Sequence, residues 1–189
     1  MWIPLLGLAI IFGSFQTVHA AIPVQQAATE KKNRYVESGV FVGGFEHGPQ
    51  VLLSMRRSYD KDTKIERIVL DLGPEQGSPT QNPGEKSEGF KAGRPGFFHV
   101  SYQKNPRRVL VDLHNVTTTK VDESKAKQIL GKSHFFRLPR IIADSYTNDL
   151  TIELPLREEI KSRSKLPKVE VFELSSVGQP GRIVIDTKE

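Results

Sequence analysis

The chain of 189 residues contains no cysteine. This absence excludes disulfide bonds, a thiolate nucleophile and zinc sites that use cysteine ligands. The fold must therefore be held together by its apolar core. A chain near 150 residues buries about 68 to 70 % of the surface that it exposes when unfolded, which is enough for one stable domain without covalent links.

Charged side chains are missing from the first 20 positions. An apolar run of 14 residues ends at Phe15, and the small residues Val18 and Ala20 follow at the positions that flank a signal-peptidase cut. We therefore expect residues 1–20 to be a secretory signal peptide, cleaved after Ala20. An uncleaved membrane anchor is the alternative, but the run is shorter than the ~20 residues of a spanning helix and contains Pro4. We expect no transmembrane segment after cleavage.

Motifs of catalysis are also missing. The chain has no H-E-x-x-H pair, no G-x-S-x-G elbow and no glycine-rich loop that leads into a helix. The histidines beyond the signal segment are dispersed and lack the spacing of metal ligands. They are His47, His99, His114 and His134. We expect a protein that is not an enzyme and that holds no metal and no cofactor.

Basic residues exceed acidic ones, with 27 Lys and Arg against 22 Asp and Glu, and all of them follow residue 20. The formal net charge of +5 favours anionic partners over cationic ones. Nucleic acid fits this charge but does not fit a secreted protein. We therefore expect no nucleic-acid partner.

Short runs rich in Val, Ile and Phe alternate with turn residues over most of the chain, which is typical of an all-β domain. One short helix is predicted near residues 122–130. Asp122 is the expected N-cap, and Gly131 is expected to close the last turn in a left-handed conformation.

Two segments show no apolar period. Residues 21–34 end in a basic run and are predicted to be a flexible linker. Residues 73–96 hold six glycines and four prolines, so they are predicted to be an insertion, either disordered or a binding loop. The folded domain is expected to span residues 35–189.

The two halves of the chain, divided near residue 131, each contain four predicted strands in the same order. The first half reads "VLLSMRRS", "ERIVLDL", "FFHVSYQ" and "RRVLVDL"; the second reads "HFFRLPRIIAD", "DLTIEL", "KVEVFEL" and "GRIVIDT". A duplicated unit is the simplest explanation. We therefore predict a β-sandwich of two similar antiparallel sheets, built from a duplicated four-strand unit.

Three of these strands share one pattern, a basic residue, three apolar residues and an acidic residue, which we call the charge-flanked pattern. It occurs as "RIVLD" (67–71), "RVLVD" (108–112) and "RIVID" (182–186), and "DLTIE" (149–153) is an altered copy in the position that matches the first. Alternate residues of a strand face opposite sides. The charges are therefore expected on the outer surface, with apolar neighbours in the core.

The outward charges have two interpretations. In the first, antiparallel neighbours place the Arg of one strand opposite the Asp of the next, and a basic residue should then accompany Asp149. In the second, the Arg side chains bind carboxylates or phosphates of a ligand, and the surface should be weaker around Asp149. Tyr102 is either a core residue or a ring that stacks on the ligand. The candidate ligand-binding residues are Arg67, Asp71, Arg108, Asp112, Arg182 and Asp186, with Arg107 and Tyr102.

Four segments carry a resemblance to a known family. They are "TKIERIVLDLG" (63–73), "FFHVSYQKNPRRVLVDLHNV" (97–116), "NDLTIELPL" (148–156) and "KVEVFELSSVGQPGRIVIDTK" (168–188). Together with the segments that link them, they cover residues 50–188. In these segments, in their order and in the duplication, the chain resembles the AMIN domain family.

This resemblance implies a β-sandwich of two similar sheets that serves as a non-catalytic targeting module in the bacterial cell envelope. In N-acetylmuramoyl-L-alanine amidases such a domain directs the zinc hydrolase domain to peptidoglycan at division sites, and in secretins it lies in the periplasm. We therefore expect a periplasmic protein that binds peptidoglycan and localises itself or a partner to the wall. The alternative is an adaptor that binds another envelope protein through a sheet edge or the 73–96 insertion, without contact to the wall.

Overall fold

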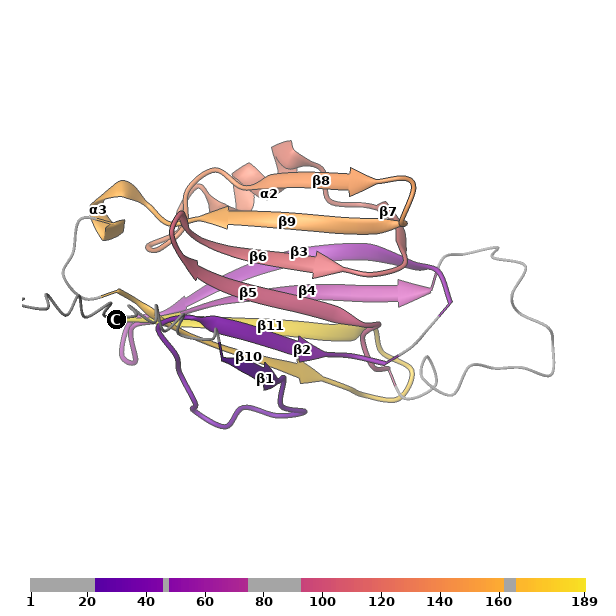
Figure 1. Ribbon diagram of the computed structural model, residues 1–189, viewed down its shortest axis with the longest axis horizontal. Helices are drawn as coiled ribbons and strands as arrows, with labels where there is room; N and C mark the ends of the chain where they lie inside the picture. Colours follow the sequence, from indigo (N-terminus) through magenta and orange to yellow (C-terminus); the bar gives the residue numbers. More distant parts are fainter. Residues whose placement is uncertain (1–22, 46–47, 75–92, 162–165) are drawn as a thin grey trace, which may run out of the picture.

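The computed structural model describes residues 23–45, 48–74, 93–161 and 166–189. Within these ranges the chain forms two facing β-sheets, which confirms the predicted all-β sandwich (Figure 1). Sheet A runs in the order β1 (Val24–Gln26), β2 (Gly39–Gly43), β5 (Phe98–Lys104), β6 (Arg107–Leu113), β9 (Asp149–Pro155), β8 (Arg140–Asp144). Sheet B runs in the order β10 (Lys168–Leu174), β11 (Gly181–Lys188), β4 (Ile65–Pro74), β3 (Gln50–Asp60), β7 (Val116–Thr119).

The strand order follows the proposed duplication. Each half of the chain gives one hairpin to each sheet: β3–β4 and β10–β11 to sheet B, and β5–β6 and β8–β9 to sheet A. The counterparts in the two halves are β3 and β8, β4 and β9, β5 and β10, and β6 and β11. When each strand is replaced by its counterpart, the order β5-β6-β9-β8 becomes β10-β11-β4-β3. This is the observed order of the second sheet, as a duplicated unit requires.

The prediction that both sheets are antiparallel is correct for seven of the nine strand pairs in the described residues and wrong for the other two. Strand β1 pairs with β2 in parallel, and β7 pairs with β3 in parallel, so both sheets are mixed. These two outer strands are three and four residues long. Such short segments carry too few residues to show an alternating pattern in the sequence.

The core lies between the two sheets and follows the two-residue period of the strands. In β4 the side chains of Ile68, Leu70 and Leu72 are at most 2 % exposed, as expected for the inward face. The same alternation buries every second residue of β6 and β9. The buried residues of those two strands are Val109, Val111, Leu113, Leu150, Ile152 and Leu154.

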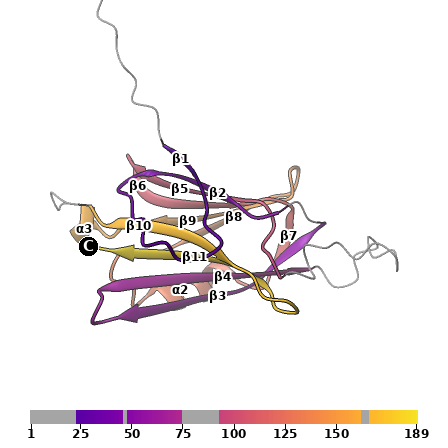
Figure 2. The same cartoon turned by 90° about the horizontal axis from the view of Figure 1, so that it is seen from below.

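The segment predicted to be a flexible linker at 21–34 does not fit that description from residue 23 onward. After β1 on sheet A, the chain crosses to sheet B, where Ala28 bridges Phe172 and Val36 bridges Val169, both in β10 (Figure 2). We call residues 28–36 the strap. These bridges are main-chain pairs, which need no apolar side chains and so leave no signal in the sequence.

One helix, α2 (Glu123–Leu130), closes the opposite side of the sandwich, and a short second one, α3 (Glu158–Lys161), follows β9. The Asp122 carboxylate accepts the N–H of Lys125 at 2.7 Å, which confirms the predicted N-cap. The prediction for Gly131 is wrong, because its φ of −57° is right-handed. The chain there continues into a turn in which Ser133 N–H donates to the Leu130 carbonyl at 2.9 Å.

The predicted signal peptide and residues 75–92 of the predicted insertion lie outside the described residues. At the borders of that insertion, β4 extends to Pro74, and Gly96 bridges Phe45. In the described ranges, no helix is long and apolar enough to cross a membrane.

Candidate functional site

Two of the candidate residues, Arg67 and Asp186, form an ion pair on sheet B in which the carboxylate is buried and the guanidinium is partly exposed. The two residues are cross-strand partners, and the guanidinium binds both carboxylate oxygens, with Nε 2.7 Å from Oδ1 and Nη2 2.8 Å from Oδ2. From the strap, Lys31 Nζ donates to Oδ2 at 2.9 Å. Burial alone would raise the pKa of Asp186, but hydrogen bonds from Arg67 and Lys31 outweigh it and hold this pKa below its ordinary value.

The reciprocal residues of the same two strands lie opposite each other but do not form an ion pair. Arg182 and Asp71 are cross-strand partners, as the antiparallel register predicts. The carboxylate of Asp71, however, accepts two hydrogen bonds from Arg56, at 2.8 and 3.0 Å, and one from Ser54. The buried Nε of Arg182 has no hydrogen-bond partner among the described residues.

On sheet A, β6 and β9 do not pair in the register that would place Arg108 opposite an acidic residue. Arg108 lies opposite Pro155 instead. Arg108 Nη1 still forms an ion pair with Glu153, at 2.9 Å. The hydroxyl of Thr151 donates to Asp112 at 2.7 Å, so this carboxylate is satisfied without a cation.

The altered strand copy contains Asp149, whose Oδ1 lies 3.2 Å from His114 Nδ1. Asn115 N–H also points to this oxygen, at 3.4 Å. A basic neighbour at Asp149 is the feature expected if the outward charges pair with one another across strands. The cross-strand interpretation thus fits Arg67 and Asp186, whereas Asp71, Asp112 and Arg182 are not paired in that way.

Tyr102 belongs to the core. Its side chain is 2 % exposed, and its hydroxyl donates to the carbonyl of Pro167 at 2.7 Å. Burial raises the pKa of this phenol above its ordinary value. A ring in this position cannot stack on an external ligand, which is the correction that the structure makes to the candidate site.

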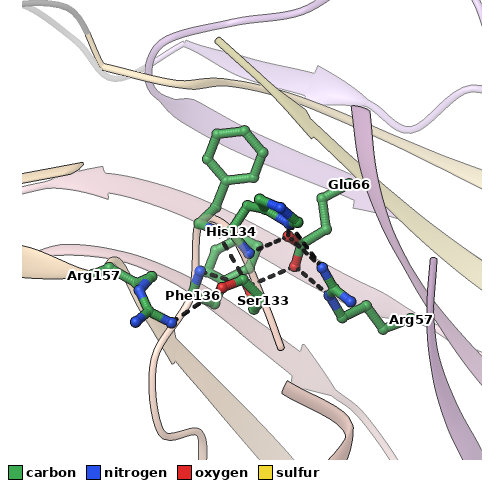
Figure 3. Close-up of polar contacts among 7 residues, drawn as sticks. Arg57, Glu66, Ser133, His134, Phe136 and Arg157 are labelled. Atoms are coloured by element: carbon green, nitrogen blue, oxygen red, sulfur yellow. Dashed lines mark hydrogen bonds and ion pairs between the residues drawn. The ribbon is translucent and has the colours of Figure 1, made fainter. Parts of the chain in front are cut away.

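A buried polar cluster around Glu66 was not recognised in the sequence (Figure 3). Glu66 has the same parity in β4 as Ile68, so it points inward, and it is 0 % exposed. Arg57 Nε lies 3.1 Å from Oε1, Ser133 Oγ donates to Oε1 at 2.5 Å, and His134 N–H donates to Oε2 at 2.7 Å. The carboxylate thus fastens the loop that follows α2 to sheet B.

The hydroxyl of Ser133 is fully engaged in this cluster. While it donates to Glu66, its oxygen accepts the N–H of Phe135 at 3.2 Å and that of Phe136 at 2.7 Å. The ring of His134 stacks on Tyr59, with 3.7 Å between the ring centroids. The arrangement organises a loop, and the serine makes no hydrogen bond to a histidine nitrogen that would activate it as a nucleophile.

Two adjoining hollows, of about 300 and 450 Å³, lie where the β5–β6 turn, the end of β9 and the segment before β8 meet α2 and α3. Figure 1 shows the β5–β6 turn, the end of β9 and α3 at the same end of the sandwich. Both hollows are lined by Lys127, Arg137 and Leu138, so we treat them as one site, the basic groove. Its charged residues are Arg107, Arg108, Lys127, Arg137, Arg140 and Arg157, with Glu123, Glu153, Glu158 and Glu159.

The cations of the basic groove outnumber its carboxylates, six to four. Glu153 is shared by Arg108 at 2.9 Å and Arg140 at 3.6 Å, which leaves Arg140 with a long and incomplete contact. Arg107 Nη1 is buried and has no hydrogen-bond partner among the described residues. The exposed guanidinium of Arg140 therefore keeps donors available for an anionic ligand.

The remaining ion pairs of the groove are exposed and weak enough to rearrange. Arg137 Nη1 lies 2.9 Å from Glu158, with side chains that are 49 % and 64 % exposed. Exposed pairs of this kind contribute only about 0 to 1 kcal/mol. A carboxylate or phosphate can therefore displace them at low cost and accept several guanidinium hydrogen bonds.

Of the predicted site residues, the structure brings only Arg107 and Arg108 into the groove. Lys127, Arg137, Arg140 and Arg157 complete it and were not among the candidate ligand-binding residues, because the pattern within single strands does not show which segments lie side by side in the fold. Among the described residues, no group of three or more His, Asp or Glu side chains is arranged to hold a metal ion.

Comparisons with known proteins found no matching protein-family model, no matching curated protein and no matching solved structure.

Proposed function

We propose that this protein is a non-catalytic periplasmic module that binds peptidoglycan and localises itself or a partner to the cell wall or division site. The observation that carries the proposal is the basic groove, with six cations against four carboxylates and an exposed, incompletely paired guanidinium on Arg140. The resemblance to AMIN domains motivates the choice of ligand. The chemistry of the groove supports an anionic one.

Peptidoglycan suits this site because its stem peptides end in carboxylates and are repeated along the polymer. Each carboxylate can accept bidentate hydrogen bonds from a guanidinium. A single contact in an open, solvated groove is weak and is screened by salt, with a Debye length of about 8 Å at physiological ionic strength. Retention then comes from rebinding at many equivalent sites.

The groove is a better candidate than the outer face of sheet B. There Asp186 is covered by the strap and the Arg67 guanidinium is committed to it. Asp71 is likewise committed to Arg56. A ligand that binds Arg67 or Asp71 on that face would have to break these bonds first, whereas Arg140 in the groove is exposed and has only one long contact to lose.

Co-sedimentation with purified sacculi across a salt series tests the proposal. The wild type is expected to sediment at low salt and to be released as salt rises. Arg137→Glu is expected to bind about 5- to 30-fold more weakly, the equivalent of about 1 to 2 kcal/mol. Lys120→Glu is the matched control, because it makes the same charge change at an exposed lysine outside the groove and should bind much more tightly than Arg137→Glu. Absence of sedimentation at low salt, or equal loss in both variants, would refute wall binding through the groove.

A second function, an adaptor for another envelope protein, is favoured by a different observation. Leu138, Ile142 and Tyr146, which lie along and beside β8, are 64 %, 46 % and 97 % exposed. Exposed apolar side chains beside a free strand edge are typical of protein contacts. Failure to sediment with sacculi, together with saturable binding to one purified envelope protein that Ile142→Lys abolishes, would favour this function.

A further inference from the structure

Strand β8 carries an additional, unrecognised copy of the charge-flanked pattern, "RIIAD" at 140–144. Ile141 faces inward, opposite the buried Ile152 of β9. Arg140, Ile142 and Asp144 therefore lie together on the outer face of sheet A. Unlike the other copies, this one has a pairing partner on only one side, because β8 is the last strand of its sheet.

Among the residues that the structure describes, no strand pairs with the outer edge of β8 along its five residues. The outer edge of β10 is occupied by the strap, through the bridges at Val36 and Ala28. The outer strands β1 and β7 have only three and four residues. Natural sheets usually cover or disrupt such an edge, since its unpaired N–H and C=O groups can pair with another chain.

The main-chain groups of β8 are oriented for such pairing. Ile141 N–H donates to the exposed Glu123 carboxylate at a long 3.4 Å, so it points away from β9. Ala143 has the same parity, and its N–H therefore points to the same free side. A second strand can accept both hydrogen bonds.

Each end of β8 carries a charge that its neighbours neutralise poorly, a positive one at Arg140 and a negative one at Asp144. Arg140 is 66 % exposed and has only its 3.6 Å share of Glu153. Asp144 lies directly opposite Asp149 of β9, an unfavourable pairing of like charges. Among the residues that the structure describes, Asp144 forms no ion pair, and its Oδ1 accepts only turn N–H groups, that of Tyr146 at 2.8 Å and that of Thr147 at 3.4 Å.

The molecule already shows how two such strands pair. In sheet B, β4 and β11 are antiparallel copies of the pattern, with Val69 opposite Val184 at the centre. This register places Arg67 opposite Asp186, where the bidentate ion pair forms. The same register applied to two β8 strands requires only a second copy of this chain, because the pattern is self-complementary.

We propose that β8 is a self-association edge, at which two copies of the chain pair antiparallel about a two-fold axis at Ile142. Arg140 of each copy then lies opposite Asp144 of the other. Ile141 and Ala143 exchange main-chain hydrogen bonds across the axis, and the two Ile142 side chains cover each other. Sheet A becomes continuous through the dimer. The interface is small, so the dimer is expected to be weak and concentration-dependent.

A single-cysteine variant tests the geometry directly, because the native chain contains no cysteine. Ile142 would form a non-hydrogen-bonded pair with its own counterpart, with Cα atoms about 4.5 Å apart. This separation is compatible with a disulfide. Under mild oxidation, Ile142→Cys is expected to form a covalent dimer at least about tenfold faster than Val177→Cys, which is 82 % exposed and remote from β8.

Charge exchange tests the register. By sedimentation velocity up to about 1 mM protein, Arg140→Asp and Asp144→Arg are each expected to weaken the dimer about tenfold, since each places like charges opposite each other. The double variant should recover association. An equimolar mixture of the two single variants should associate more tightly than either alone, because their charges are complementary.

Two further variants separate this inference from folding and from wall binding. Ala143→Pro removes a free-edge N–H that β9 does not use and should abolish the dimer while the thermal unfolding midpoint of the monomer stays within a few degrees. Arg137→Glu, which tests the groove, should leave the dimer unchanged. A monomer at all concentrations, equal oxidation rates for the two cysteine variants, or a dimer that is indifferent to the charge exchange would each overturn the proposal.

Discussion

At the scale of residues, the sandwich depends on buried carboxylates that are each surrounded by donors. Glu66 and Asp186 are both 0 % exposed. A buried carboxylate without partners costs several kcal/mol, and the cations left behind when it is removed cost a comparable amount. Each of these two residues therefore attaches a segment distant in sequence to sheet B. Glu66 binds the loop at Ser133, and Asp186 binds the strap at Lys31.

The variant Asp186→Asn tests this dependence. It leaves Arg67 and Lys31 without their anion, and because both cations are partly exposed, the free energy of unfolding should fall by about 2 to 3 kcal/mol, less than for a fully buried pair. Urea unfolding measures the change. Asp62→Asn, at an exposed position, is the control and should stay within about 0.5 kcal/mol of the wild type.

The same variant gives a pH dependence with a definite sign. The pKa of Asp186 in the folded protein lies below its ordinary 3.8. The stability that this carboxylate contributes is therefore complete above pH 4 to 5 and is lost as the pH falls through the folded pKa. The stability difference between wild type and Asp186→Asn should shrink below about pH 4. A difference that stays constant down to pH 2 would contradict the ion pair.

The alternation of apolar and charged residues was enough to predict the inward face of β4 and to suggest cross-strand pairing of Arg with Asp, but not to show that β4 and β11 are neighbours and that Arg67 pairs with Asp186. The pairing of Asp71 could not be predicted in the same way, because a bulge between Leu52 and Ser54 of β3 shifts the register. The shift places Ser54 opposite Asp71 and brings Arg56 within reach. A bulge of this kind leaves no mark in the sequence pattern.

At the scale of elements, the strands with a clear two-residue period could be predicted from the sequence. Segments attached through their main-chain N–H and C=O groups could not. The strap has no apolar period, yet Glu170 Oε1 accepts the N–H groups of Lys32 at 2.9 Å and Arg34 at 3.0 Å. The pattern in β8 went unrecognised because it stands within a longer apolar and basic segment. Its edge position depends on the arrangement of all the other strands.

Helix α2 was predicted from its cap, and the cap can be tested. Asp122→Ala removes the acceptor for Lys125 N–H and should lower the free energy of unfolding by about 1 kcal/mol. Lys125→Ala keeps the main-chain donor and the cap, so it serves as the control and should change stability by less. Equal losses in the two variants, measured by thermal unfolding, would mean that the cap contributes nothing.

At the scale of the whole molecule, duplication explains the architecture, and divergence between the halves explains the candidate site. In sheet B the two charge-flanked strands keep the register that pairs Arg with Asp. In sheet A the altered copy pairs with a shifted register, and Arg108 is directed to Glu153 in the groove. The fold class could be predicted because it follows from local periodicity. The groove could not, because five separate segments of the chain form it.

If the basic groove binds carboxylates of the cell wall, a soluble muropeptide should bind there. Titration of ¹⁵N-labelled protein with such a muropeptide, followed by two-dimensional NMR, measures this binding residue by residue. Saturable shifts are expected for the amides of Arg107, Lys127, Arg137 and Arg140, and they should disappear in Arg137→Glu. Shifts confined to the outer face of sheet B around Arg182, or no shifts at low salt, would contradict binding in the groove.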